Sequence, residues 1–364
     1  MFVTTARRTK TGLCSELLLP SGSVAGRIAR RFYGNDRRKN VSLQPGKAPI
    51  PSHGNPVKLK FRSAGSCGIE MSNTKMELLY GNSPIKAAMT QGRREIYGLY
   101  YQGGFMGDEP RHDMSELIDM ARAQLLPVKE VSKADMTAAI YGANHQGVLL
   151  KVSKSDAVRL HSLGPLVNGR YSVDLVTGVI ELEPRRKFPL LVCLDGIQDE
   201  RNLGSIIRTA LFFGADGVML SGKCACRPSP IVSKTSAGAM ECMAIYRSND
   251  MPKVLAKARE NGWTVVCTTV REAENGSDER SPLDRITRLS GPTVLVLGSE
   301  GQGVSFGLQS LSDIDIHIPT PSDIPSYIDS LNVGVAAGVI LSTGSIDDDF
   351  VDRFDFAMVD ANDS

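Results

Sequence analysis

Residues 189–345 alternate short, continuously apolar runs with amphipathic stretches, and this pattern limits the possible folds more than any other feature. The runs LLVCLD, DGVML, WTVVCTT and TVLVLG lack the alternating polar residues of a half-exposed strand. Between them, GSIIRTALFFG and MPKVLAKARENG carry apolar residues at helical spacing and end at Gly214 and Gly262. Strands that are apolar on both faces are typical of a parallel sheet covered by helices. The pattern therefore predicts an α/β fold built on a parallel sheet.

The C-terminal part of this region continues the pattern. DIDIHIP alternates, with isoleucines on one face, and NVGVAAGVIL predicts a helix of small residues that packs closely on a sheet.

A smaller α/β unit is predicted upstream, over residues 73–152. EIYGLYY and GVLLKVS predict strands, MSELIDMARAQ predicts a helix, and VSKADMTAAIYGANHQG predicts a helix and a turn. Residues 153–188 are polar and rich in turn residues, so we expect a connector between the two units. A length of 364 residues suits about two domains.

The two ends of the chain differ sharply in charge. The first sixty residues contain many arginines and lysines but only Glu16 and Asp36 as acids, whereas residues 346–364 are acidic. A basic, acid-poor N-terminus is typical of a mitochondrial transit peptide, so residues 1–72 are predicted to be leader and linker, and the location to be the mitochondrial matrix. The alternative is a disordered basic arm that binds nucleic acid.

Composition argues against several other classes. No run of about 18 apolar residues occurs, so neither a transmembrane helix nor a membrane partner is expected. The seven cysteines form no Cys-x-x-Cys pair, and no histidine pair lies near Cys224 and Cys226, which argues against a metal site. We expect reduced, mostly buried thiols in an intracellular compartment.

Polar residues gather at three predicted strand-to-helix junctions, the places where ligands bind in parallel sheets. QDERNLGSIIRTA carries Asn202 and Arg208, VLVLGSEGQGVS carries Glu300, and the segment that opens the last helix carries Ser330 and Asn332. Taken singly, an asparagine or serine here is a helix cap and a glycine is a turn residue. Arg208 differs, because its planar fork suits a phosphate.

The second junction excludes two common enzyme classes. GSEGQG has neither the glycine spacing of a dinucleotide fingerprint nor the Gly-Lys-Ser/Thr ending of a phosphate loop, so a dehydrogenase or nucleotidase fits poorly. Of the five histidines only His317 lies near a junction, which argues against Ser-His-Asp or Cys-His catalysis.

Taken in this order, the junctions resemble the motifs of the SpoU (TrmH) family of SPOUT RNA 2′-O-ribose methyltransferases. Asn202, Gly204 and Arg208 match the first motif, LGSEGQG is similar to the second, and SLNV is similar to the third. KTSAGAMECM resembles the intervening Ser-x-Gly-Ala segment. This resemblance covers about residues 189–345. The upstream unit, with His-Gln-Gly at 145–147, resembles the substrate-binding domain of ribosomal-RNA members.

The resemblance implies a fold that composition does not reveal, a parallel sheet whose C-terminal segment forms a trefoil knot. It also implies a homodimer that holds S-adenosylmethionine through backbone groups of the second and third motifs. By position, the cofactor contacts fall on Thr268, Gly298, Ile318 and Leu331.

The resemblance also implies roles for the five junction residues. Arg208 grips the RNA phosphate beside the target ribose, and Ser330 and Asn332 hold the 2′-hydroxyl. Asn202 holds Glu300 or the ribose, and Glu300 orients the other groups. An arginine stays protonated at accessible pH, so the identity of the proton acceptor is left open.

The implied reaction is 2′-O-methylation of a nucleotide, a guanosine, in mitochondrial large-subunit rRNA. Two alternatives remain. A tRNA substrate is disfavoured by the upstream domain, and a non-catalytic RNA-binding ribosome-assembly factor is disfavoured by the intact junction residues.

Overall fold

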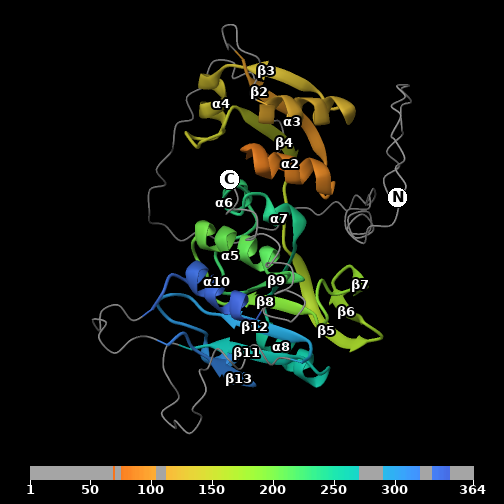
Figure 1. Ribbon diagram of the computed structural model, residues 1–364, viewed down its shortest axis with the longest axis vertical. Coiled ribbons are helices and arrows are strands. Elements are labelled where there is room, and N and C mark those ends of the chain that lie inside the picture. Colours follow the sequence, from red (N-terminus) through yellow and green to blue (C-terminus); the bar gives the residue numbers. More distant parts are fainter. Residues whose placement is uncertain (1–68, 70–74, 104–111, 270–289, 320–329, 345–364) are drawn as a thin grey trace, which may run out of the picture. The chain divides into compact units, whose positions relative to one another are not determined.

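The computed structural model describes residues 69, 75–103, 112–269, 290–319 and 330–344 (Figure 1). Apart from Ile69, the predicted leader lies outside the described residues, and so does the predicted acidic tail. Residues 75–344 contain two sheets, and the contacts within the chain place both sheets in the same compact body. We call residues 75–153 the small unit and residues 156–344 the large unit.

The described residues of the small unit form a four-stranded sheet with the helices α2, α3 and α4, drawn in orange to yellow in Figure 1. Its strands follow the order β1-β4-β2-β3, in which only the β2–β3 pair is parallel. Its elements are β1 (Met76–Tyr80), α2 (Asn82–Gln91), β2 (Ile96–Gln102), α3 (His112–Ala123), β3 (Val128–Val131), α4 (Lys133–Ala139) and β4 (Val148–Ser153).

The large unit contains a nine-stranded sheet in the order β13-β11-β12-β8-β9-β10-β5-β6-β7. Its strands are β5 (Val158–Val167), β6 (Arg170–Leu175), β7 (Gly178–Leu182), β8 (Leu190–Leu194), β9 (Gly217–Ser221), β10 (Ala244–Ser248), β11 (Thr264–Thr268), β12 (Thr293–Leu297) and β13 (Ile314–Ile316). Its helices are α5 (Glu200–Phe212), α6 (Pro230–Thr235), α7 (Ala239–Cys242), α8 (Met251–Glu260), α9 (Phe306–Gln309) and α10 (Val333–Thr343).

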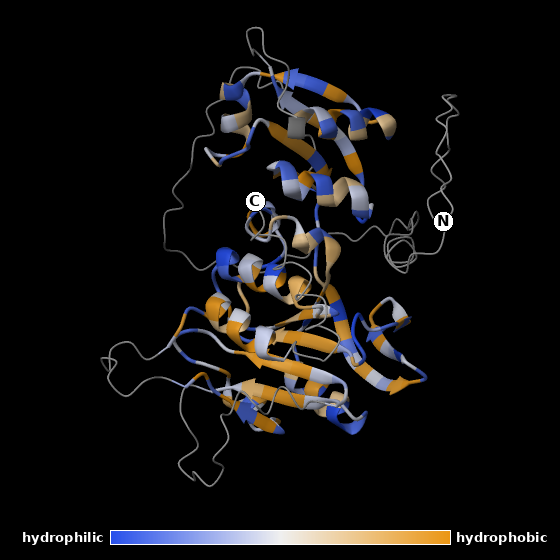
Figure 2. Cartoon of the chain, in the orientation of Figure 1, coloured by the Kyte–Doolittle hydropathy of each residue, from blue (hydrophilic) through white to orange (hydrophobic). Residues whose placement is uncertain are grey.

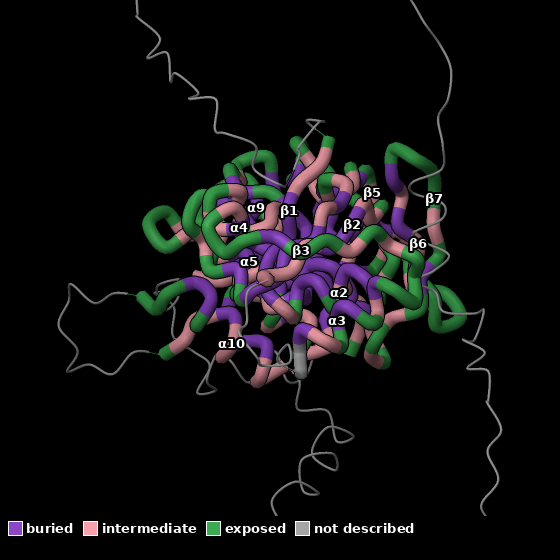
Figure 3. Tube along the Cα trace, turned by 90° about the horizontal axis from the view of Figure 1, so that it is seen from above, coloured by how far each residue is buried: buried purple, intermediate pink, exposed green. Residues whose placement is uncertain are grey.

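The parallel part of the large sheet confirms the predicted α/β class. From β13 to β5 every neighbouring pair is parallel. The continuously apolar runs are its central strands, and β9 and β12 are buried along their whole length. These strands appear orange in Figure 2, and buried residues gather toward the interior in Figure 3. Burial on both faces explains why their sequences lack the alternation of a half-exposed strand.

Helices cover both faces of the large sheet (Figure 1). On one face, α5, α6, α7 and α10 share a single apolar cluster with the strands, including Ile206 from α5 and Ala337 from α10. On the other face, α8 buries Val254 and Leu255. The predicted trefoil knot of the C-terminal segment stays a prediction, since residues 270–289 and 320–329 lie outside the described part.

The segment between the two units differs from the predicted turn-rich connector, because residues 158–182 form the antiparallel strands β5, β6 and β7. β5 also pairs in parallel with β10. Trp263 Nε1 donates to the carbonyl of Gly164 at 2.8 Å, and the Trp263 ring meets Tyr171 edge-on at 5.6 Å. Of the residues that suggested turns, Asn168 and Gly169 form the tight turn between β5 and β6, and residues 183–189 follow β7, so the strands themselves are part of the large sheet.

The first predicted helix of the large unit begins earlier than its apolar spacing suggests. α5 starts at Glu200, and its cap is Asp199, whose carboxylate accepts from the backbone N–H of Arg201 at 2.7 Å. Asn202, a possible cap by sequence, therefore lies inside the first turn. Its side chain does not cap the helix, because Asp199 does so. Gly214, at φ 74°, follows the helix end as predicted.

None of the helices in the described ranges is long and apolar enough to cross a membrane.

Candidate active site

The candidate site lies at the carboxyl edge of the parallel strands. Because β13, β11, β12 and β8 are parallel neighbours, their carboxyl ends meet at one edge of the sheet. Thr268 ends β11, Gly298 follows β12, and Ile318 lies two residues after β13. Three of the four predicted cofactor residues therefore come from adjacent strand ends.

Three predicted catalytic residues form one closed hydrogen-bonded triangle at this edge. Asn202 Nδ2 donates to Glu300 Oε1 at 3.1 Å, and Asn332 Nδ2 donates to the same oxygen at 2.6 Å. Asn332 Nδ2 also donates to Asn202 Oδ1 at 3.1 Å. The triangle joins residues 130 positions apart in sequence and brings together all three predicted junctions.

The backbone completes this network at the start of α10. Asn332 caps that helix, because its Oδ1 accepts from the N–H of Gly334 at 3.0 Å. The N–H of Val333 donates to Glu300 Oε1 at 3.2 Å. A carboxylate near a helix N-terminus is stabilised by the helix dipole as well as by its hydrogen bonds. Asn332 is thus a helix cap, as an asparagine at such a junction is when taken singly, and it is also a member of the candidate site.

Glu300 stands in a tight loop that its glycines make possible. The backbone groups of Ser299 and Gly303 bond each other at 2.8 and 3.2 Å, and Gly303 has φ 64°. A Cβ on Gly298 would lie 2.0 Å from the carbonyl carbon of Gly303, so no side chain fits there. Gly298 and Gly303 are therefore required by the loop geometry that presents Glu300.

Asp195 supports this loop and was missed at the sequence level. Its residue is 3% exposed, and its carboxylate accepts from Ser221 Oγ at 2.7 Å and from the N–H of Ser305 at 2.9 Å. Burial alone would raise the pKa of Asp195, but the hydrogen bonds from Ser305 and Ser221 outweigh it and hold the pKa below its usual value. The signal available in the sequence was an aspartate directly after the apolar strand LLVCL.

We expect Asp195→Ala to lower the free energy of unfolding by about 2–4 kcal/mol, because the buried hydroxyl of Ser221 loses its acceptor, which costs about 1–3 kcal/mol, and the half-buried N–H of Ser305 adds a smaller loss. Urea unfolding measures the change. The control is Asp250→Ala, which removes the exposed cap of α8 and should cost only about 1 kcal/mol. Equal losses for the two variants would contradict the supporting role of Asp195.

The two remaining predicted catalytic residues do not join the triangle. Arg208 is exposed on α5, six residues after Asn202, which is about 9 Å along a helix axis. Within the described part of the chain its guanidinium makes no hydrogen bond or ion pair. Ser330 is exposed two residues before the α10 cap.

The predicted cofactor residues offer backbone and apolar surface. Thr268 Oγ1 donates to the carbonyl of Val296, which ties β11 to β12 at 3.2 Å. Ile318 is half-buried against the core, and Leu331 is 46% exposed. Exposed apolar residues beside free strand ends suit a ligand with an aromatic ring and hydrogen-bonding edges.

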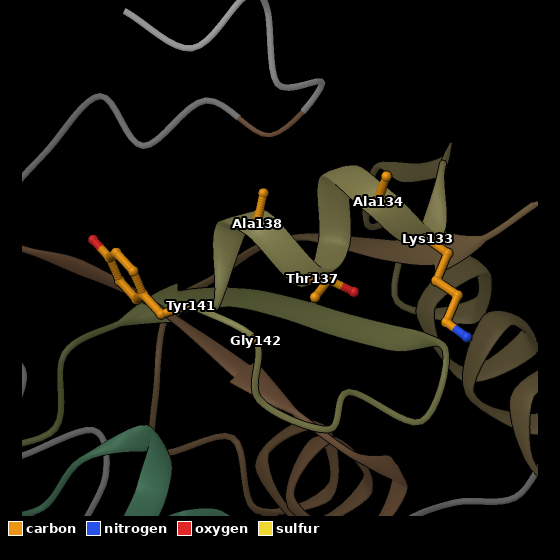
Figure 4. A pocket seen from close by; sticks show the side chains of 6 residues that line it. All are labelled: Lys133, Ala134, Thr137, Ala138, Tyr141 and Gly142. Atoms are coloured by element: carbon orange, nitrogen blue, oxygen red, sulfur yellow. The ribbon is translucent and has the colours of Figure 1, made fainter. Parts of the chain in front are cut away.

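The pockets found among the described residues lie away from the triangle. A shallow pocket of about 710 Å³ follows the outer face of α4 and is lined by Lys133, Thr137 and Tyr141 among others (Figure 4). Another, of about 290 Å³, lies beside Asp195 and Lys223. Neither is lined by a predicted catalytic or cofactor residue, so we place the site by its hydrogen bonds. Among the described residues no cluster of histidine, cysteine, aspartate and glutamate is suited to a metal ion.

Family models match both units. The model of the SpoU rRNA Methylase family matches residues 189–342, and a model described as RNA 2′-O ribose methyltransferase substrate binding matches residues 78–158.

Similar proteins are known in eukaryotes and bacteria. The chain is 32% identical to rRNA methyltransferase 1, mitochondrial, of Homo sapiens over 74% of this chain and 72% of the relative. It is 31% identical to the protein of the same name in Schizosaccharomyces pombe, over 73% and 88%. It is 28% identical to a 23S rRNA (guanosine-2′-O-)-methyltransferase of Pseudomonas putida, over 74% and 95%.

Solved structures share the fold. An AdoMet-bound rRNA methyltransferase from Sinorhizobium meliloti aligns with a TM-score of 0.53 at 23% identity, over 74% of this chain and 87% of that one. An RNA 2′-O ribose methyltransferase aligns with a TM-score of 0.54 at 20% identity, over 74% and 88%.

Proposed function

This chain belongs to the SpoU rRNA methylase family, and on that premise we propose that it methylates the ribose 2′-hydroxyl of a guanosine in mitochondrial large-subunit rRNA. It is an RNA methyltransferase that uses S-adenosylmethionine. The observation that carries the proposal is the Asn202–Glu300–Asn332 triangle, formed beside strand ends suited to the cofactor.

The residues at the strand ends fit S-adenosylmethionine. Leu331 and Ile318 offer apolar surface for an adenine ring, and the backbone at Gly298 and Thr268 offers groups for its polar edges. When bound, the cofactor supplies an electrophilic methyl group on a sulfonium. We assign these four residues to cofactor binding.

We assign Arg208 to the RNA phosphate beside the target ribose. A planar guanidinium binds phosphate oxygens in pairs, which fixes the position and direction of the neighbouring 2′-hydroxyl. Its exposure and lack of partners within the described chain support this role, since no bond must break before RNA binds. Ser330, exposed near the triangle's helix, is assigned to holding the hydroxyl.

Glu300 is assigned an orienting role in place of a general base. Its Oε1 accepts from the side chains of Asn202 and Asn332 and from the N–H of Val333, so that oxygen is committed to structure. Three donors, two from side chains and one from the backbone at the start of α10, therefore fix the position of this oxygen. Asn202 and Asn332 are thereby held in fixed rotamers facing the substrate side.

The rRNA substrate and the guanosine rest on the relatives and on the small unit. The human and fission yeast relatives are named as mitochondrial rRNA methyltransferases, and the Pseudomonas relative is named for guanosine in 23S rRNA. A substrate-binding model matches the small unit, and the presence of this upstream unit supports rRNA over the tRNA alternative. We propose the mitochondrial matrix as its location.

We also propose that the chain acts as a homodimer. The packed pair of helices α5 and α10 leaves apolar side chains exposed, with Phe212 at 69% and Val335 at 54%. A second copy would bury this surface and would place Arg208, on the same helix as Phe212, at or near the interface.

Transfer of tritium from labelled S-adenosylmethionine tests the proposed function. We expect label on the 2′-oxygen of one guanosine in unmodified mitochondrial large-subunit rRNA. Label in tRNA alone would establish the alternative substrate, and label in neither RNA would support a non-catalytic assembly factor.

Deleting residues 1–60 is expected to leave an active enzyme and to prevent mitochondrial import, because the basic, acid-poor leader would be gone. Cell fractionation of a tagged truncation measures this. A truncation that still reaches mitochondria, but binds RNA more weakly than the full chain, would favour the nucleic-acid arm.

A further inference from the structure

A buried ion cluster joins the small unit to the large unit. Arg94, between α2 and β2, is 8% exposed and holds Glu241 of α7 with two parallel bonds, Nε to Oε2 and Nη2 to Oε1, both 2.7 Å. Its Nη1 bonds the carboxylate of Glu77 on β1 and the carbonyl of Ser153. A planar guanidinium thus connects two elements of its own unit to a helix of the other.

The large unit supplies a matching acceptor. Glu241 is 3% exposed and also accepts from Ser233 Oγ of α6 at 2.8 Å. Burial raises the pKa of Glu77, although Arg94 opposes the shift. Charges this deeply buried persist only when they are paired, so neither unit could present this cluster alone without water entering it.

The His-Gln-Gly motif makes a second contact between the units. Gln146, held at φ 56°, accepts at Oε1 from Lys234 Nζ of the large unit at 2.6 Å and from the N–H of Asn82 at 3.2 Å. Glycines leave room for this contact, at Gly81 for the lysine side chain and at Gly238 for the backbone of the small unit. A Cβ on Gly81 would lie 2.3 Å from Lys234 Nζ, and a Cβ on Gly238 would lie 2.7 Å from the carbonyl oxygen of Ser83.

The helices α6 and α7, which carry Lys234 and Glu241, also contact α5, the helix that carries Asn202 and Arg208. Ser229 Oγ, at the start of α6, donates to Glu200 of α5 at 2.6 Å. Gly204 of α5 leaves room for Thr235, because a Cβ there would lie 1.9 Å from Thr235 Oγ1. The α6–α7 segment therefore contacts the small unit as well as the helix that carries Asn202 and Arg208.

We propose that Arg94 and Gln146 are positioning residues. They fix the small unit, which binds the RNA, at one distance from α5, the helix that carries Asn202 and Arg208. The inference rests on the proposed function, because it treats the small unit as the part that binds rRNA. With the units fixed, RNA held by the small unit delivers its target ribose to Arg208 in one geometry. A displacement of about 1 Å can lower a rate roughly 100-fold, so the docking acts on turnover more than on affinity.

The test compares full-length Arg94→Gln with the wild type. We expect the affinity for S-adenosylmethionine to be unchanged and the affinity for rRNA to fall by less than about threefold, since each unit keeps its own surface. The single-turnover methylation rate should fall roughly 10- to 100-fold. Hydrogen exchange should speed up on both sides of the contact, in residues 77–83 and 233–242.

Two further variants separate positioning from loss of structure. Gln146→Ala leaves the buried charges intact and should shift the rate and the exchange in the same direction but less, and Arg94→Lys should be intermediate because it keeps charge without the fork. The control is Lys86→Gln, which removes an exposed ion pair with Glu116 inside the small unit and should change neither reading.

The outcomes are distinguishable. Faster exchange at the contact with an unchanged methylation rate would overturn the positioning role, and so would a slower rate with unchanged exchange. If the wild-type protein transfers no methyl group to rRNA, the proposed function fails instead, while the exchange data still report whether Arg94 holds the two units together.

Discussion

Arg208→Ala is expected to reduce kcat/KM for methyl transfer at least about 100-fold, the scale seen when one preorganised charge contact to the reacting group is lost. Its guanidinium has no partner within the described chain, so removing the side chain breaks no hydrogen bond or ion pair of the folded protein. The free energy of unfolding should stay within about 0.5 kcal/mol of the wild type. Calorimetric titration with S-adenosylmethionine, beside the tritium assay, separates cofactor binding from transfer.

Matched variants sharpen this result. Arg201→Ala removes another exposed arginine from the same helix, one that is paired weakly with Asp199 at 3.6 Å, and should leave turnover nearly normal. Ser330→Ala should depress the rate without changing the fold. Near-normal turnover in Arg208→Ala would rule out the phosphate-clamp assignment.

A fragment that begins at Asp156 is expected to fold, dimerise and bind S-adenosylmethionine, while losing most affinity and activity toward rRNA. It keeps β5, β6 and β7, which complete the large sheet beside β10. Its remaining RNA binding should be weak and strongly salt-dependent, because contacts to phosphate supply most of the affinity once the small unit is removed. RNA titrations at two salt concentrations measure this, with dimerisation checked by light scattering.

A fragment that begins at Phe188 is the informative comparison. It lacks the three strands and uncovers Trp263, which is 2% exposed, and Tyr246, which is 3% exposed. Burying an aromatic side chain of this size contributes about 1.5–3 kcal/mol, so the shorter fragment should be several kcal/mol less stable. Equal stability would show that β5–β7 belong to a connector, and full rRNA methylation by the Asp156 fragment would show that the small unit is not the substrate reader.

The sequence predicted the large sheet well because its central strands are buried on both faces. Leu191–Leu194 and Thr293–Leu297 have no polar alternation to mislead the assignment, and Gly214 and Gly262 marked helix ends correctly. Edge strands were harder. Residues 158–182 pair a buried face with a polar one and contain turn residues, so their local pattern resembles a loop until β10 supplies a pairing partner.

The candidate site was predictable as a set of residues but not as a geometry. Asn202, Glu300 and Asn332 were grouped by the order of three motifs, and the structure joins them. Their hydrogen bonds span long sequence separations, which local spacing does not encode. Asp195 and Arg94 were missed for the same reason, since each looks like an ordinary charged residue until its distant partners, Ser305 and Glu241, are known.

Asn332 has a structural role besides its proposed catalytic one, whereas Arg208 has none within the described chain. Asn332 caps α10, so a descendant of this protein that had given up catalysis would still retain it to keep that helix. Arg208 has no such second duty within the described chain, and nothing in the fold would protect it from mutation. In a lineage that drifts from enzyme to ribosome-assembly factor, the arginine would disappear first and the asparagine would persist. Under the proposed phosphate role of Arg208, position 208 is therefore where we expect working enzymes and inactive descendants to differ.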